Sequence, residues 1–264
     1  MSNEQVKISE AVQRLAVRTL AVNPAGEGLC LIGGFRYRLL DASCRRSLDI
    51  DYHWSGDLEK KQAEVITLFR KKLLPLLRER MGCEGRVYPA TGPDAESPVV
   101  KTVELAVWQK KGSLGRITIP VDITRIPCTD KPIARTVDGV VYLSASDADM
   151  VESKIVAIMA RPCLEDRDIM DVFLFQDKLV ADSAERVGRK FALLHLTSDH
   201  VLPLLKRIEA DRGYHVRNLE GIVNNQIDAP AAANIRKAGG AAMIFDRVME
   251  LLKTVCIFKK ERSR

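Results

Sequence analysis

Two short motifs contain the residues whose types and spacing could do chemistry. Asp49 and Asp51 alternate with apolar residues in the segment 48–52. Because side chains on a strand repeat every two residues, both carboxylates would lie on one face, where they can hold hard cations such as Mg²⁺ or Mn²⁺. Gly33 and Gly34 end a short apolar run, and a strand, a glycine pair and a helix start bring backbone N–H groups against a phosphate. Together the motifs predict a site for metal ions and phosphates.

A third carboxylate is expected on a neighbouring strand. Phosphoryl-type transfer consists mainly of positioning an in-line attack and neutralising charge at the transferring phosphorus. Asp122 is the candidate, since it lies on the polar face of the alternating segment 116–123, opposite the isoleucine and valine side chains. We therefore expect Asp49, Asp51 and Asp122 to be the metal carboxylates.

The elements that must position these residues change in type along the chain. The first half alternates between the two periodicities, with strands expected at 29–32, 48–52, 99–108 and 116–123 and helices at 4–20 and 59–81. From residue 144 onward the spacing is helical, with helices expected near 147–160, 165–178, 184–194, 199–210 and 231–255. The pattern predicts an α+β protein, with an N-terminal mixed sheet and flanking helices over residues 1–135 and a helical C-terminal domain over residues 136–264.

Composition and charge narrow the class of protein. With 264 residues, 46% of them hydrophobic, the chain can bury one large core or two modest ones. The net charge of +6 favours polyanionic partners such as RNA or nucleotides. The six cysteines form no CxxC pair and no short Cys/His cluster, so neither a zinc site nor a disulfide framework is indicated. The sequence begins without an apolar signal core and contains no long apolar window, which predicts a cytoplasmic protein with no membrane partner.

The same motifs resemble a known superfamily. Gly33-Gly34 and the segment Arg46-Ser47-x-Asp49-Ile50-Asp51 resemble the Gly-Gly/Ser and Asp-x-Asp elements of the DNA-polymerase-β-like nucleotidyltransferases. Downstream, two blocks are similar to the second conserved region of the AbiEii/AbiGii branch, the nucleotidyltransferase toxins of bacterial toxin–antitoxin and abortive-infection systems. These blocks are Glu152-x-Lys154-x-x-Ala157-x-x-x-Arg161 and Arg167-Asp168-x-x-Asp171.

This resemblance implies an NTP-dependent enzyme that transfers a nucleoside monophosphate to an acceptor. The implied acceptor is RNA, at the 3′ end of a tRNA, and the implied partner is a cognate antitoxin. The implied catalytic residues are Asp49, Asp51, Asp122, Lys154 and Asp168. The implied nucleotide-binding residues are Gly33, Gly34, Ser47, Lys154 and Arg161. Asp168 would orient Lys154 or the acceptor hydroxyl, and the role of Asp171 is left open.

One residue departs from the family pattern, and other functions therefore remain as alternatives. The family usually carries Ser or Thr after the glycines, whereas this chain has Phe35, so a hydroxyl that would hydrogen-bond the terminal phosphates is missing. The alternatives are a small-molecule nucleotidyltransferase, such as those that adenylylate aminoglycosides, and a non-catalytic relative that binds a partner. For Lys154 and Arg161, which share one helix face, the alternative is a surface ion-pair face with Asp149 and Glu152.

Overall fold

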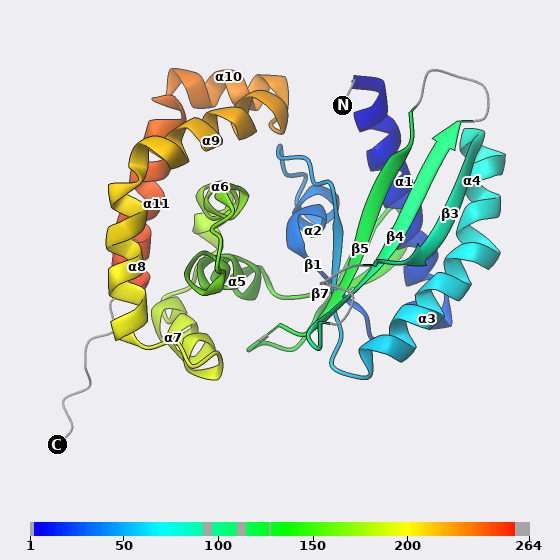
Figure 1. Ribbon diagram of the computed structural model, residues 1–264, viewed down its shortest axis with the longest axis horizontal. Coiled ribbons are helices and arrows are strands. Elements are labelled where there is room, and N and C mark those ends of the chain that lie inside the picture. The colour runs from blue at the N-terminus through cyan, green and yellow to red at the C-terminus, as the bar shows by residue number, and fades with distance from the viewer. Residues whose placement is uncertain (1–2, 92–96, 110–114, 127, 257–264) are drawn as a thin grey trace. The chain divides into compact units, whose positions relative to one another are not determined.

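The computed structural model describes residues 3–91, 97–109, 115–126 and 128–256. The chain divides into two compact units (Figure 1). The first comprises Met1–Ile126 and Pro132–Ala145, and the second comprises Pro127–Lys131 and Ser146–Arg264.

The first unit contains a seven-stranded mixed sheet in the order β3-β4-β5-β2-β1-β7-β6. The strands are β1 (Cys30–Ile32), β2 (Ile50–His53), β3 (Cys83–Pro89), β4 (Val100–Gln109), β5 (Ile117–Thr124), β6 (Ile133–Val137) and β7 (Val140–Ser144). The pairs β2–β5 and β1–β7 are parallel and the other neighbours are antiparallel. The α+β class predicted from the sequence is confirmed.

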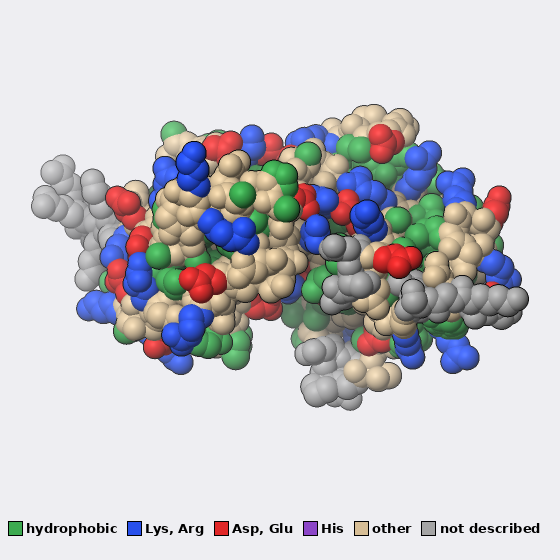
Figure 2. All heavy atoms as spheres, turned by 90° about the horizontal axis from the view of Figure 1, so that it is seen from above, with side chains coloured by type: hydrophobic (Ala, Val, Ile, Leu, Met, Phe, Trp, Pro, Cys, Tyr) green, Lys and Arg blue, Asp and Glu red, His purple; other side chains and the backbone are tan. Residues whose placement is uncertain are grey.

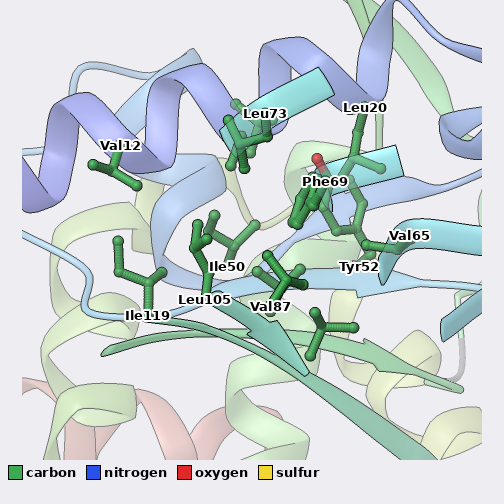
Figure 3. Close-up of a cluster of buried hydrophobic side chains, with 14 of the residues drawn as sticks. Val12, Leu20, Ile50, Tyr52, Val65, Phe69, Leu73, Val87, Leu105 and Ile119 are labelled. Atoms are coloured by element: carbon green, nitrogen blue, oxygen red, sulfur yellow. The ribbon is translucent and has the colours of Figure 1, made fainter. Parts of the chain in front are cut away.

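Helices of the first unit pack on the sheet and enclose its core. They are α1 (Asn3–Ala21), η1 (Pro24–Gly26), α2 (Gly33–Leu40), α3 (Leu58–Leu68), the π-helical turn η2 (Phe69–Leu73) and α4 (Leu74–Met81). Figure 3 shows how side chains from α1, η2 and the central strands meet, among them Val12, Phe69, Leu73 and Ile50. All four are fully or almost fully buried. Burial of such side chains stabilises this unit, because apolar area removed from water contributes about 25 cal/mol per Å².

Alternation along β5 separates the core from the site face. Its residues are alternately buried and partly exposed, with Ile119, Val121 and Ile123 fully buried. Asp122 lies between the last two and faces the other side of the sheet, as the sequence predicts. Asp51 has the same relation to the buried Ile50 in β2.

The long helix predicted over residues 59–81 is three elements in the structure. Asp57 caps α3, because its carboxylate accepts a hydrogen bond of 3.0 Å from the backbone N–H of Lys60. The π-helical turn η2 then precedes α4, and Pro75 lies in the first turn of α4. The backbone stays helical from η2 into α4, and the N–H of Leu74 donates to Phe69 O, five residues earlier. Pro75 follows this wider turn and has no N–H of its own to donate.

The sequence pattern did not predict three strands of the sheet, β3, β6 and β7. β3 contains Gly85 and only two buried side chains. The β6–β7 hairpin occupies residues 133–144, so the predicted domain boundary after residue 135 falls within β6, inside the first unit. β6 is partly exposed throughout, which weakens its hydrophobic signal. The Asp138-Gly139 turn, with φ of 49° and 73°, is the two-residue hairpin signal that could have revealed it.

The second unit is built of helices. They are α5 (Asp147–Ala160), α6 (Asp166–Phe175), η4 (Gln176–Lys178), α7 (Ser183–Leu193), α8 (Ser198–Ala210), α9 (Arg212–Asn225), α10 (Ala229–Lys237) and α11 (Gly240–Cys256). Ser146 caps α5, since its hydroxyl accepts a hydrogen bond of 3.1 Å from the N–H of Asp149. The predicted helix over 231–255 is divided at Gly239 and Gly240, whose φ values of 120° and 67° end α10. None of the described helices combines the length and the apolar character needed to cross a membrane.

A buried ion network joins the segment Pro127–Lys131 to α5 and α7 within the second unit. Asp149 and Glu152 are fully buried. Lys190 Nζ lies 2.7 Å from Asp149 Oδ1 and 3.0 Å from Glu152 Oε2. Arg186 binds Glu152 through Nε at 2.6 Å and Asp130 through both terminal nitrogens at 2.7 and 2.8 Å. The hydrogen bonds from Arg186 lower the pKa of Asp130 to about 2.

Candidate active site

Strand register brings two of the predicted carboxylates together. Asp51 in β2 and Asp122 in β5 are direct partners of a parallel pair. Neighbouring strands lie about 4.8 Å apart and in-register side chains share a face, so the two carboxylates are neighbours on one side of the sheet. Thr102, the partner of Asp122 on β4, donates a hydrogen bond of 2.5 Å from Oγ1 to Asp122 Oδ1. This bond fixes one oxygen of Asp122.

The glycine pair lies against Asp51 and the segment that precedes β2. Gly33 is the first residue of α2 and has a φ of 73°. A Cβ at this position would lie 1.8 Å from Asp51 Oδ2. A Cβ on Gly34 would lie 2.4 Å from Arg45 Nη2 and 2.6 Å from Ser47 Oγ. The two glycines are therefore required by close approach of an aspartate on one side and a guanidinium and a hydroxyl on the other.

Asp49 is placed differently from its partner in the Asp-x-Asp motif. β2 begins at Ile50, so Asp49 lies in the bend before the strand, and the sheet does not impose the predicted alternation on it. Ser47 Oγ donates a hydrogen bond of 2.7 Å to Asp49 Oδ1. Within the part of the chain that the structure describes, no three His, Cys, Asp or Glu side chains are close enough together to hold a metal ion as they stand. Assembly of Asp49, Asp51 and Asp122 around a metal remains a prediction.

Phe35 belongs to the hydrophobic core. Its side chain is fully buried in the cluster formed by the sheet and its helices, so it does not occupy the position of a phosphate-binding hydroxyl. A hydroxyl is supplied near the glycine pair by Ser47, which is itself buried. Ser47 belongs to the segment that precedes β2, and its hydroxyl hydrogen is donated to Asp49.

The predicted residues of the second unit form one ion cluster on α5 and α6. Lys154 Nζ lies 2.7 Å from Asp168 Oδ1 and 3.1 Å from Asp171 Oδ2. Arg161 Nη1 lies 2.7 Å from Asp168 Oδ2. Asp168 and Asp171 are almost completely buried, whereas 13% of the Lys154 side chain is exposed. Asp168 therefore holds both cations, and it fixes the position of the Lys154 ammonium.

The alternative in which Lys154 pairs with Asp149 and Glu152 is wrong. Asp149 and Glu152 bind Arg186 and Lys190 instead, because both carboxylates point into the buried network of α5 and α7. Lys154 lies on another face of α5.

Sequence reasoning missed residues that surround the predicted site. Thr102 and Arg45 contact Asp122 and the glycine pair through side chains that only the strand register and the loop path bring there. Gln13 donates hydrogen bonds to the backbone on both sides of residue 48. No local signal in the sequence marks Thr102 or Gln13, because their hydrogen-bond partners are 20 to 36 positions away. Arg45 comes close to Gly34 only through the path of the loop.

Comparison with known proteins identifies the fold. No protein-family model matches the sequence, and no curated protein matches it. The solved structures that it resembles have a nucleotidyltransferase fold, and this is the fold of the chain.

Three of these structures cover nearly the whole chain. A candidate nucleotidyltransferase from Helicobacter pylori has 14% identity, a TM-score of 0.57 and 96% coverage of each chain. JHP933 from the same organism has 15% identity, a TM-score of 0.54 and 96% coverage of each chain. MenT4, a nucleotidyltransferase toxin from Mycobacterium tuberculosis, has 16% identity and a TM-score of 0.51, over 95% of this chain and 92% of its own.

Proposed function

We propose that this protein is a metal-dependent nucleotidyltransferase that transfers a nucleoside monophosphate from an NTP to RNA. The observation that carries the proposal is the pairing of Asp51 with Asp122 in register, directly beside the glycine pair that begins α2. Adjacent carboxylates and a helix start are the groups that a metal-bound triphosphate requires. The nucleotidyltransferase fold supports the same conclusion.

The donor set suits the proposed metal. Asp49, Asp51 and Asp122 offer only carboxylate oxygens, the ligand type that Mg²⁺ and Mn²⁺ prefer. When bound, such a metal neutralises charge that develops on the transferring phosphoryl group. Thr102 holds one oxygen of Asp122 and Ser47 holds one oxygen of Asp49, so both carboxylates are oriented by hydroxyl groups before any ligand arrives.

Each unit contains groups of a type that binds phosphate. Backbone N–H groups at Gly33 and Gly34 begin α2 and favour anionic ligands, and Ser47 adds a hydroxyl. Lys154 would contact a phosphate as a compact charge. Its contacts with Asp168 and Asp171 keep the ammonium in one place, and Arg161 binds the same Asp168.

The proposed acceptor is the 3′ end of a tRNA, and the proposed context is the toxin of a toxin–antitoxin pair. A net charge of +6 favours a polyanionic acceptor, and one structural neighbour is a nucleotidyltransferase toxin. Lys and Arg side chains are spread over the face in Figure 2 and mixed with Asp and Glu, so charge alone does not mark the path of the RNA. NTPs and RNA are cytoplasmic, and so is the proposed location.

The test is transfer of label from NTPs. The purified protein is incubated with Mg²⁺, each α-labelled NTP in turn, and either cellular RNA or a panel of aminoglycosides. The proposal predicts labelled RNA, enriched in the tRNA fraction, and no label when EDTA replaces Mg²⁺. Label on an aminoglycoside instead would establish the small-molecule enzyme. No transfer with any NTP would contradict catalysis and favour the partner-binding alternative.

A further inference from the structure

Gln13 connects the first helix to the segment that carries the proposed metal carboxylates. Its side chain is 1% exposed. Nε2 donates to two backbone carbonyls, at 3.1 Å to Ser47 O and at 3.2 Å to Asp49 O. These two residues flank Leu48, just before the chain enters β2 at Ile50. The buried amide of Gln13 thus fixes the backbone of Asp49, two residues before Asp51.

A second contact from α1 holds the beginning of the same segment. Glu10 accepts hydrogen bonds from Arg38, at 3.2 Å to Nε and 3.1 Å to Nη2. Arg38 in turn donates through Nη1 to Ser43 O at 2.6 Å. Glu10 and Gln13 are three residues apart and so share one face of α1. This face of α1 therefore holds the connection between α2 and β2 near its beginning, at Ser43, and near its end, at Ser47 and Asp49.

We infer that Gln13 is a positioning residue for Asp49 and Asp51. The inference rests on the proposed function, because it assigns Gln13 a part in assembling that metal site. α1 lies outside the segment 29–175 in which the motifs occur, and nothing in the sequence marks this glutamine.

The physical reason lies in the structure of the bend. Asp49 precedes the strand, so sheet hydrogen bonds do not fix it, and a flexible backbone there would cost conformational entropy each time the carboxylates gathered around a metal. Gln13 donates to two neighbouring carbonyls and so orders this backbone before a metal binds. Without Gln13 the segment must be ordered by the metal itself, so the metal affinity falls.

The experiment compares Gln13→Met with Val17→Ala. Methionine has a length similar to glutamine and no N–H donor. Val17 is fully buried in α1 and packs in the core, so its truncation weakens the same helix without touching the bend. Gln13→Glu is a second variant, since an ionised carboxylate accepts hydrogen bonds and cannot donate them to a carbonyl. Arg38→Met, at a side chain that is 19% exposed, tests the second contact from α1 should both Gln13 variants fail to fold.

Four quantities are measured on each protein: the melting temperature, hydrogen exchange of the peptide spanning 41–50, the Mg²⁺ dependence of transfer, and Mn²⁺ binding. The inference predicts faster exchange in both Gln13 variants and a half-saturating Mg²⁺ concentration raised about tenfold, the scale of one lost hydrogen bond. Val17→Ala should lower the melting temperature and leave exchange of this peptide and the Mg²⁺ dependence unchanged. If Arg38→Met is the only one of these site variants that folds, faster exchange and a raised half-saturating Mg²⁺ concentration in that variant support the positioning role of this face of α1.

Unchanged Mg²⁺ dependence in the Gln13 variants of an active enzyme would overturn the inference and leave the proposed function standing. An equal shift in Val17→Ala would also overturn it, because the effect would then be one of stability. A wild-type protein that neither transfers label nor binds Mn²⁺ would contradict the proposed function and the inference together.

Discussion

Replacement of Gly33 by alanine tests how closely the glycine pair and the carboxylates fit. At a φ of 73° an alanine adopts the left-handed region, which costs about 1–2 kcal/mol. Its Cβ would also lie 1.8 Å from Asp51 Oδ2 and 2.5 Å from Asp51 Cγ. Relief of this overlap requires movement of the carboxylate or of α2, and overpacking of this kind costs about 1–3 kcal/mol.

The chain contains a matched control for the backbone part of this cost. Gly139, in the β6–β7 turn of the same unit, has the same φ of 73°, and a Cβ there would meet nothing within 4 Å. Gly139→Ala should therefore lose only the backbone term of about 1–2 kcal/mol. Gly33→Ala should lose about 2–5 kcal/mol, the sum of the two terms. The difference between the variants measures the contact with Asp51.

Urea unfolding followed by tryptophan fluorescence is the assay, because both tryptophans, Trp54 and Trp108, belong to the first unit. Gly33→Ala should also lose transfer activity that Gly139→Ala retains. Adding Asp51→Ala to Gly33→Ala should recover part of the stability, since the carboxylate is removed while Cβ of residue 51 remains 2.7 Å away. Equal unfolding free energies for Gly33→Ala and Gly139→Ala would refute the close approach of Gly33 and Asp51.

Three further predictions concern the core, the ion cluster and the buried network. Phe35→Ser should destabilise the first unit by about 3–5 kcal/mol in the same unfolding assay by leaving a cavity, and tighter NTP binding by calorimetry would contradict this. Lys154→Met should lower the melting temperature, because Asp168 and Asp171 lose a buried partner, and should abolish transfer. Lys154→Arg should not fully restore transfer, and wild-type kinetics in both variants would contradict the role of Lys154. The folded-state pKa of Asp130, about 2 against an ordinary 3.8, contributes stability that is present above about pH 4 and lost as the pH falls toward 2. Unfolding free energies measured between pH 2 and pH 5 should show this loss in the wild type and a smaller one in Arg186→Met, and identical pH profiles would refute it.

Local patterns predicted the parts of the fold that depend on local chemistry. Alternation in β5 correctly separated Asp122 from the buried Ile119 and Val121. Asp51 and Asp122 became direct partners because alternation fixed their faces and the parallel pairing of β2 with β5 fixed their register.

Features that depend on distant partners could not be predicted in the same way. The position of Asp49 depends on where β2 begins, and the sequence pattern extends two residues beyond that point. The partners of Lys154 depend on which face of α5 meets α6, because Asp168 and Asp171 belong to that second helix. Gln13 carries no signal at all, since its two hydrogen bonds form only after α1 has packed against the segment before β2.

The most direct test of the central claim is the label-transfer assay on Asp51→Asn and Asp122→Asn. Asp138→Asn is the matched control, because Asp138 is an exposed aspartate of the same unit in the β6–β7 turn, and asparagine tolerates its positive φ. The account predicts that both site variants keep the wild-type unfolding profile and lose Mg²⁺-dependent transfer by a factor of 100 or more, on the order of several kcal/mol of charge stabilisation, while Asp138→Asn transfers label as the wild type does. Undiminished transfer in Asp51→Asn and Asp122→Asn would contradict the claim that this pair of carboxylates is the active site.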